Sequence, residues 1–338
     1  MNQKTVLLLF GGESPEHDVS LSSAKNVFKA LNKKSYQIEL VCISKEGVWQ
    51  QVDSVREATQ YDSPIVVKLG ERKFSANGKE ITPDVILPIL HGENGEDGAP
   101  QALAKLLHIP IAGPSLISAV IAMDKDITKK LLTIAELPVV DWVVVRQSFH
   151  LPSYKAISEH VKSQKLFVKP ARTGSSVGVS KVHDESEFKA AINTAFSYDN
   201  KVIVEAAIEE ARELEVAVIG NDKPQATLPG EIIPGEEFYS YDDKYSDTSE
   251  ALVRIPADIS KEVAEEIRQL ALNSYKATEG WGMARIDFFL TKTGEIYINE
   301  INTIPGFTNI SMYPKLWDHE GLNYSALLDK LIDYALVS

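Results

Sequence analysis

The stretch VLLLFGGESPEHDVSLSSA, residues 6–24, determines how the fold begins. Its first five residues are apolar, and two glycines and a polar loop follow them. So short an apolar run before a Gly-Gly turn is typical of a buried parallel strand. A secretory signal needs a longer apolar segment, and a membrane span needs about 20 apolar residues. The sequence therefore predicts a strand over 6–10 and, after the loop, a helix over 20–31.

The pattern of alternating elements continues downstream. Strands are predicted at 38–43 and 84–89, and a helix at 99–107. This order favours a doubly wound parallel sheet, in which ligands bind beyond the carboxyl ends of the strands. The loops GGESPEHDVS and HGENGEDG follow two of these strands. We expect an amino-terminal substrate domain over 1–122, a central lobe over 123–205 and a carboxyl-terminal lobe over 206–338 with a mobile loop at 234–250.

Composition narrows the classes of partner. The chain has 338 residues, a formal net charge of −13 and one cysteine, Cys42. An acidic balance disfavours nucleic acid and anionic membranes as partners, so the cations for an anionic substrate must be gathered locally. A single cysteine excludes an internal disulfide and a thiolate metal cluster. This fits a reducing compartment, and we expect a cytoplasmic protein.

The strongest chemical signal is an acidic hairpin near the carboxyl end. Asp287 lies in the predicted strand ARIDFFL, the turn is TKTG, and Glu300 and Asn302 lie in the strand IYINEIN. Glu300 and Asn302 point to one face, and the hairpin places Asp287 about one diagonal step from Glu300, roughly 7–8 Å away. Three oxygen ligands suit Mg²⁺. A solvated acidic face is the alternative, but the apolar neighbours in both strands favour the metal site.

Two lysines and a Gly-rich turn could supply the missing positive charge. Lys169 ends the apolar strand LFVK and precedes the turn ARTGSSVGV, and residues 165–182 predict a β-hairpin with a long turn. The turn offers backbone amides to phosphate oxygens, although neither a Walker A motif nor a dinucleotide fingerprint is present. A plain hairpin loop explains the turn equally well. Lys125 begins a helix, and a solvated surface charge is its alternative.

A resemblance to a known family emerges from the motifs together. The stretches that carry it, in order along nearly the whole chain, are FGGESPEHDVSLSSA, HGENGEDGAPQ, MDK, VKPARTGSSVGV, ELEVAV, EFYSYDDKY, ARID and NEINTIPGFTNISMYP. They resemble the ATP-grasp superfamily, in which two lobes close on ATP, and within it the D-alanine–D-alanine ligase family. The resemblance implies an α/β chain, α+β overall, with an ATP-grasp fold behind the amino-terminal doubly wound domain.

The resemblance implies an ATP site between two lobes. Lys125 and Lys169 match the phosphate-contacting lysines, the backbone of 205–208 would hold adenine, and Glu213 would bind the ribose hydroxyls. Asp287, Glu300 and Asn302 match the ligands of two Mg²⁺ ions, with Mn²⁺ as an alternative ion. The residues implied to contact ATP are Lys125, Lys169, Ser176, Glu205, Ala207, Ile208, Glu213 and Lys244.

The resemblance also implies sites for two amino acids. Glu16 resembles the acid that receives the ammonium of the first D-alanine, and Ser175 and Tyr245 would link it to the mobile loop. Arg285 and the amide of Gly306 match the donors to the reaction's oxyanion. The residues implied to line the substrates are His91, Ser311 and Met312. For the histidine, stabilising its own loop is the alternative.

The implied reaction is ATP-dependent joining of two D-alanines through an acyl phosphate, for peptidoglycan precursor synthesis. The alternatives are D-lactate or D-serine as the second substrate, or another ATP-grasp carboxylate–amine ligase. Tyr245 favours D-alanine over D-lactate. A silent nucleotide-binding protein is disfavoured because the charged groups that the chemistry needs are present, and an NAD-dependent dehydrogenase because the glycine fingerprint is absent. The resemblance further implies a homodimer.

Overall fold

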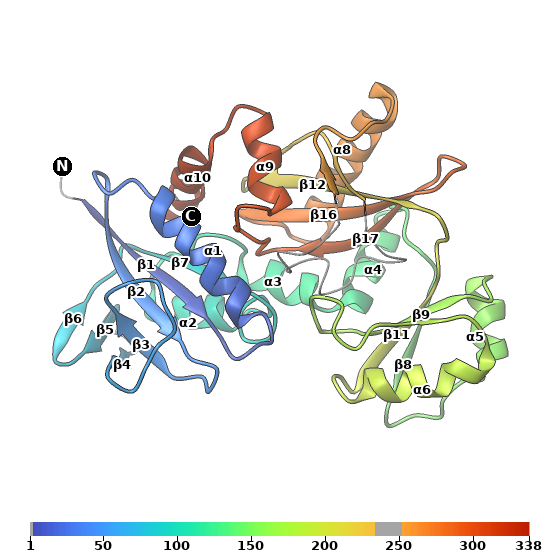
Figure 1. Cartoon of the computed structure of the whole chain (residues 1–338), viewed down its shortest axis with the longest axis horizontal. Helices are drawn as coiled ribbons and strands as arrows, with labels where there is room; N and C mark the ends of the chain where they lie inside the picture. The colour runs from blue at the N-terminus through green and yellow to red at the C-terminus, as the bar shows by residue number, and fades with distance from the viewer. Residues whose placement is uncertain (1–2, 234–251, 338) are drawn as a thin grey trace.

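Figure 1 shows the computed structural model of the chain, which describes residues 3–233 and 252–337. The expected mobile loop at 234–250, with Lys244 and Tyr245, lies outside these residues. Three sheets follow one another, within residues 4–90, 142–206 and 212–302. The domain limits predicted at 122/123 and 205/206 fall near the gaps between the sheets and stay predictions.

The first sheet has the strand order β6-β5-β4-β3-β2-β1-β7. Its strands are β1 (Lys4–Gly11), β2 (Tyr36–Ile43), β3 (Trp49–Val52), β4 (Ser63–Lys68), β5 (Lys73–Ala76), β6 (Lys79–Ile81) and β7 (Val85–Leu90). β1 pairs in parallel with β2 and β7, whereas β3 to β6 extend the sheet antiparallel. The predicted doubly wound domain is confirmed at this parallel centre, and the antiparallel strands add to it.

Helices cover both faces of this sheet. One face packs against α1 (His17–Ala30) and α10 (Tyr324–Leu336), so the first and last parts of the chain share one hydrophobic core. The other face packs against α2 (Ala99–Leu107), whose predicted bounds are confirmed. α1 begins three residues earlier than predicted, and Ser20 therefore lies inside the helix. The Ser20 hydroxyl accepts from the amide of Gly11 at 2.7 Å and donates to the carbonyl of Ile89 on β7.

The second sheet forms a separate small lobe. Its order is β10-β9-β11-β8, and all of its pairings are antiparallel. The elements are β8 (Trp142–Arg146), α5 (Tyr154–Val161), β9 (Leu166–Pro170), β10 (Ser180–Val182), α6 (Glu185–Phe196) and β11 (Lys201–Ala206). β9 and β10 form the hairpin predicted for 165–182. The two helices pack on this sheet and complete a core of its own.

The third sheet has the order β15-β14-β12-β16-β17, with β13 beside β12. The elements are β12 (Arg212–Ile219), β13 (Gln225–Ala226), β14 (Gly230–Ile233), β15 (Leu252–Arg254), α8 (Lys261–Ala277), β16 (Met283–Leu290), β17 (Ile296–Asn302) and α9 (Met312–His319). α3 (Leu116–Met123) and α4 (Lys125–Ile134) connect the first sheet to the second, and α4 packs on α8 and β17. Within the described ranges, no helix has the length and apolarity that a membrane crossing requires.

Candidate active site

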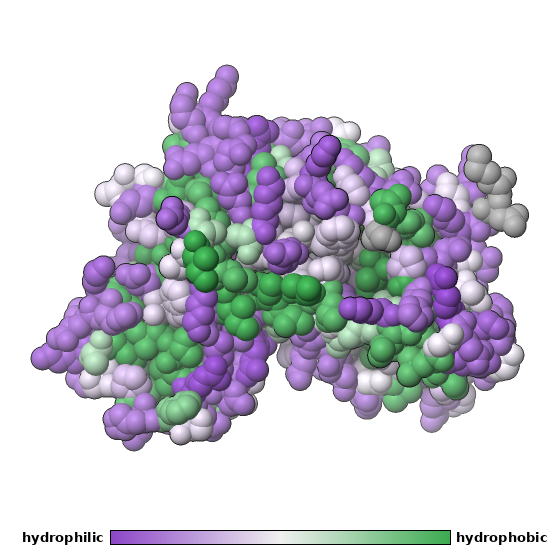
Figure 2. All heavy atoms as spheres, turned by 180° about the vertical axis from the view of Figure 1, so that it is seen from behind, coloured by the Kyte–Doolittle hydropathy of each residue, from purple (hydrophilic) through white to green (hydrophobic). Residues whose placement is uncertain are grey.

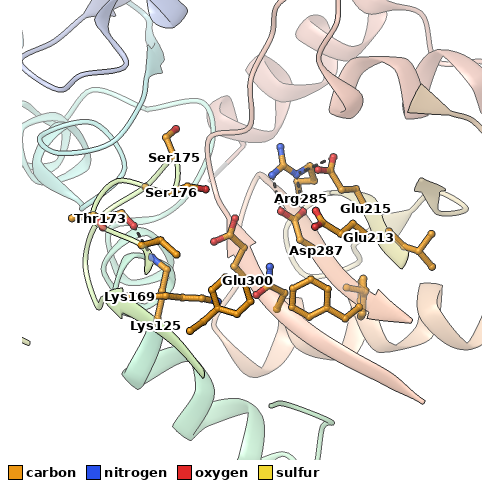
Figure 3. A pocket seen from close by; sticks show the side chains of 17 residues that line it. Lys125, Lys169, Thr173, Ser175, Ser176, Glu213, Glu215, Arg285, Asp287 and Glu300 are labelled. Carbon is orange, nitrogen blue, oxygen red and sulfur yellow. Dashed lines mark hydrogen bonds and ion pairs between the residues drawn. The ribbon is translucent and has the colours of Figure 1, made fainter. Parts of the chain in front are cut away.

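A pocket opens between the second and third sheets (Figure 3). It contains about 850 Å³ of empty space, part of which is open solvent. α4, β9 and the Gly-rich turn form one wall, and β12, β16 and β17 form the other. The predicted site residues that line it are Lys125, Lys169, Ser175, Ser176, Glu213, Arg285, Asp287 and Glu300.

The first wall carries two cations and a turn rich in amides. Asp124 caps the start of α4 by accepting from the amides of Asp126 and Ile127, and the Lys125 amide donates to the Ala171 carbonyl at 3.0 Å. These contacts fix the start of the helix beside the end of β9. The Lys125 ammonium donates to the Thr173 carbonyl at 2.6 Å. It therefore lies at the Gly-rich turn rather than on an open surface.

Left-handed backbone shapes that turn. Ser175 and Ser176 have φ of 48° and 60°, a conformation that non-glycine residues adopt rarely and that costs energy. Consecutive residues of this kind turn backbone amides toward a common point and favour an anion there. The local geometry thus supports phosphate binding more strongly than the sequence of the turn alone.

The opposite wall carries the acidic hairpin and a guanidinium. Arg285 donates from Nε and Nη2 to the two oxygens of Asp287 at 2.7 and 2.6 Å, and its Nε lies 3.2 Å from Glu215. Burial disfavours the charge of Arg285, but Asp287 and Glu215 outweigh burial and raise the pKa of the guanidinium well above its usual range. Arg285 is a fixed cation that partly neutralises the acids around it.

A bulge changes the predicted register of the hairpin. Asp287 pairs with Glu300, but Phe288 pairs with Ile298, so Asn299 is the extra residue. The prediction of a diagonal step was therefore wrong: Asp287 and Glu300 lie directly opposite each other, and Asn299 also lines the pocket. Bulges of this kind re-aim side chains beside active sites.

Asn302 lies one step further along β17 than the paired acids. It pairs with Arg285, and its amide oxygen accepts from the Ile304 amide at 3.1 Å. It does not belong to the lining of the pocket. Its predicted role as a metal ligand stays a prediction, and the amide oxygen has a second lone pair that this backbone contact does not use.

The donor set fits a hard divalent cation. The facing carboxylates of Asp287 and Glu300 offer only oxygen, and the cationic wall with its turn lies across the same pocket. In the part of the chain that the structure describes, no group of three or more His, Cys, Asp or Glu side chains could hold a metal ion alone. Oxygen ligands of this kind suit Mg²⁺, which prefers to complete its shell with water and phosphate oxygens.

The residues predicted to hold adenine lie on and after β11. Glu205 is 3% exposed, and its carboxylate pairs with Lys129 and Lys169. Burial would raise the pKa of Glu205, but the two lysines lower it to about 2. Its side chain is therefore an internal anion, and an adenine contact would fall to the backbone. Ala207 is buried, Ile208 is partly exposed, and neither lines the pocket.

A second cluster connects the two strand-end loops to the turn. Glu16, 6% exposed, lies just before α1 and accepts a hydrogen bond from the Ser175 hydroxyl. A Cβ at Gly92 would lie 2.8 Å from the Glu16 carboxylate, and one at Gly174 would lie 3.2 Å from it. Loops that are far apart in sequence thus enclose one acid, as the predicted ammonium site would require.

Glu96 belongs to the same cluster, and the sequence did not single it out. Its Oε2 accepts from the Gly92 amide at 3.0 Å, and its Oε1 is buried without a hydrogen-bond partner among the described residues. Burial, and then the charge of Glu16, raise the pKa of Glu96 well above its usual range. HGENGEDG holds three acids, and their spacing does not show which one points inward.

His91 lies beneath this cluster. The ring is 4% exposed, and Nδ1 lies 3.1 Å from the Ile304 carbonyl. Burial lowers the pKa of His91, which favours the neutral ring. The contact ties the HGENGEDG loop to the segment after β17, so both the loop-stabilising alternative and the substrate role remain open.

The segment before α9 holds the remaining predicted residues. The Ser311 hydroxyl accepts from the Thr308 amide at 3.0 Å, and a Cβ at Gly306 would lie 2.7 Å from that hydroxyl. A side chain at Gly306 would therefore displace the Ser311 hydroxyl. Met312 is buried in the core beside Gly230, so its side chain packs inward. The predicted roles of these residues stay predictions.

Sequence families match both ends of the chain. The family described as D-ala D-ala ligase N-terminus matches residues 5–114, and the family described as D-ala D-ala ligase C-terminus matches residues 131–333. The D-alanine–D-alanine ligase of Thermoanaerobacter sp. (strain X514) is 44% identical over an alignment of 359 residues, which covers 100% of this chain and 98% of that protein.

Solved structures agree with the sequence matches. The D-alanine-D-alanine ligase from Coxiella burnetii has a TM-score of 0.87 at 35% identity, covering 99% of this chain and 96% of that one. The VanG D-Ala:D-Ser ligase from Enterococcus faecalis has a TM-score of 0.88 at 35% identity, covering 99% of this chain and 100% of that one. The similarity extends over all three sheets.

Proposed function

The chain belongs to the D-alanine–D-alanine ligase family, and from this premise we propose that it uses ATP to join two D-alanine molecules. The observation that carries the proposal is a single pocket in which two lysines and an amide-rich turn face a carboxylate pair and a buried guanidinium. Phosphoryl transfer depends on positioning and on neutralising charge rather than on covalent catalysis. The pocket supplies both.

The first step activates a carboxylate, which is a poor electrophile by itself. Its oxygen attacks the γ-phosphorus of ATP, the bond to ADP breaks, and an acyl phosphate forms. Lys125, Lys169 and the amides around Ser176 would neutralise and orient the phosphates. Glu213, across the pocket, would take the ribose hydroxyls, while the backbone of 205–208 would hold adenine.

The acidic hairpin would hold the divalent cations. We assign two Mg²⁺ ions to Asp287, Glu300 and Asn302. When bound, Mg²⁺ would supply charge neutralisation of the phosphates.

The second step forms the amide bond. The amine of the second D-alanine attacks the acyl carbon, the bond to phosphate breaks, and dipeptide, phosphate and a proton result. Arg285 and the Gly306 amide would donate to the oxyanion of the tetrahedral intermediate. Glu16, held by Ser175, would bind the ammonium of the first D-alanine.

The identity of the second substrate is the main alternative. The VanG structure belongs to a D-Ala:D-Ser ligase, so this fold also supports another nucleophile. The test is to incubate the chain with ATP, Mg²⁺ and D-alanine alone or with D-serine or D-lactate, measuring ADP and identifying products by mass spectrometry. We expect D-alanyl-D-alanine as the main product. ADP release that does not depend on D-alanine would refute the proposal.

An apolar surface supports the predicted homodimer. Leu106 on α2 is 61% exposed, and Ile117 and Val120 on α3 are 60% and 45% exposed. Figure 2 shows a hydrophobic band across the middle of the rear face, at the level where Figure 1 places α3. We propose that two copies associate there, in the cytoplasm where ATP is available. Light scattering should give twice the chain mass, and Ile117→Asp should give one chain mass.

A further inference from the structure

Three charged side chains run from the protein interior to the pocket. Glu205 on β11 lies between two lysines: Oε1 is 3.0 Å from the Lys129 ammonium and Oε2 is 2.7 Å from the Lys169 ammonium. Lys129, on α4, is 2% exposed and also donates to the Val140 carbonyl at 3.0 Å. The side chain of Lys169 is 14% exposed and lines the pocket. The cluster therefore has a buried end and a ligand-facing end.

The charges of this cluster are unequal. Two ammonium groups face one carboxylate, which leaves one net positive charge at the pocket end. The low pKa of Glu205, about 2, keeps the carboxylate ionised. A buried carboxylate without a cationic partner is strongly unfavourable. If Glu205 had Lys169 alone, the ammonium of Lys169 would be committed to it.

We propose that Lys129 is a positioning residue for the nucleotide: it holds the Glu205 carboxylate while Lys169 turns from that carboxylate to the phosphates. Lys129 does not line the pocket, so it acts through Glu205. The inference rests on the proposed function of Lys169. It predicts that losing Lys129 weakens nucleotide binding and leaves D-alanine binding nearly unchanged, since the Glu16 cluster does not include it.

The test is a cycle of variants read out by ADP binding. Lys129→Met keeps the length of the apolar stem and removes the charge. We expect its Kd for ADP with Mg²⁺ to rise about tenfold, with a matching rise in KM for ATP and little change in KM for D-alanine. Adding Glu205→Gln removes the anion that holds Lys169, and affinity should return to within about threefold of wild type.

A matched control and a second variant complete the test. Lys155→Met, on α5 of the lobe that contains Glu205 and Lys169, removes an ammonium whose side chain is 82% exposed, and this variant should bind ADP like wild type. Lys129→Gln replaces Lys129→Met if the latter does not fold, because it retains a donor for the Val140 carbonyl without the charge. Its ADP affinity should fall in the same way.

The outcomes separate the two proposals. A wild-type chain that binds no ADP would overturn the proposed function, and this inference with it. If both Lys129 variants bind ADP as tightly as the wild-type chain, the inference alone is overturned. A double variant that stays as weak as Lys129→Met would also overturn it, because the lysine would then act through packing rather than through the charge of Glu205.

Discussion

Replacing Arg285 by Met should destabilise the chain in a manner that depends on magnesium. Arg285 donates to Asp287 at 2.6 and 2.7 Å and lies 3.2 Å from Glu215. The Arg285 side chain is 16% exposed and that of Asp287 is 13% exposed, so solvent screens the pair only weakly. Removing one partner of such a pair typically costs about 3–5 kcal/mol. Because the pair retains some exposure, we expect about 3 kcal/mol.

Divalent cations should recover part of this loss. Without the guanidinium, Asp287, Glu215 and Glu300 lose the positive charge that interacts with all three, so Mg²⁺ can bind where Arg285 had competed. Urea unfolding of Arg285→Met in EDTA should show the full loss in free energy of unfolding. In Mg²⁺ the loss in free energy of unfolding should be smaller. Mn²⁺ titration without nucleotide should show tighter binding than to wild type. Turnover should nevertheless fall about 10²–10³-fold, since the oxyanion loses a donor.

Arg212 provides the matched control for this experiment. It lies on the same sheet and donates to both oxygens of Glu231 at 2.7 and 2.9 Å, without lining the pocket. Arg212→Met should destabilise the chain equally with and without Mg²⁺. The reasoning fails if Arg285→Met loses the same free energy in both media, or if Arg212→Met shows the same rescue.

Three further predictions follow from the site. The pKa of Glu205 is lowered from 4.5 to about 2, so its stabilisation is present above pH 4.5 and is lost as pH falls toward 2; unfolding at several pH values should show wild type losing up to about 3 kcal/mol more than Glu205→Gln over that range. Gly92→Ala places a Cβ 2.8 Å from the Glu16 carboxylate at a φ of +71°, so KM for D-alanine should rise. The control Gly78→Ala, with φ of +77° and open space around it, should lower stability alone. Equal KM values for the two variants would contradict this prediction. Ser175→Ala removes the hydrogen bond to Glu16 and should lower kcat/KM for D-alanine about tenfold with unchanged ADP affinity, and a loss confined to ADP binding would refute the assignment.

The pattern of apolar residues along the sequence predicted the long strands correctly. The apolar run before Gly11 and the alternation around Asp287 both led to strands that the structure contains. The strands within residues 49–81 gave no such signal, because they are short and few of their residues are buried. These strands lack the long apolar runs by which buried strands are recognised.

The residues of the candidate site that the sequence analysis missed are those that only tertiary contacts reveal. Lys129 stands in KDITKKLL among other lysines, and only its packing against Glu205 shows that it is buried. Glu96 is one of three acids in its loop, and Asn299 reaches the pocket through a bulge. Composition and spacing do not predict the burial of a single lysine or acid, or the position of a bulge, because both depend on which segments pack together.

The shared core of α1 and α10 has a consequence for biosynthesis. A ribosome delivers the chain from its amino end, yet the sheet of residues 4–90 receives the cover of α10 only when residues 324–336 emerge. The lobe of residues 142–206, by contrast, contains both its sheet and the helices that cover it. Domains generally fold as units during synthesis. The lobe of residues 142–206 can thus form its whole core before the first sheet receives its cover from α10.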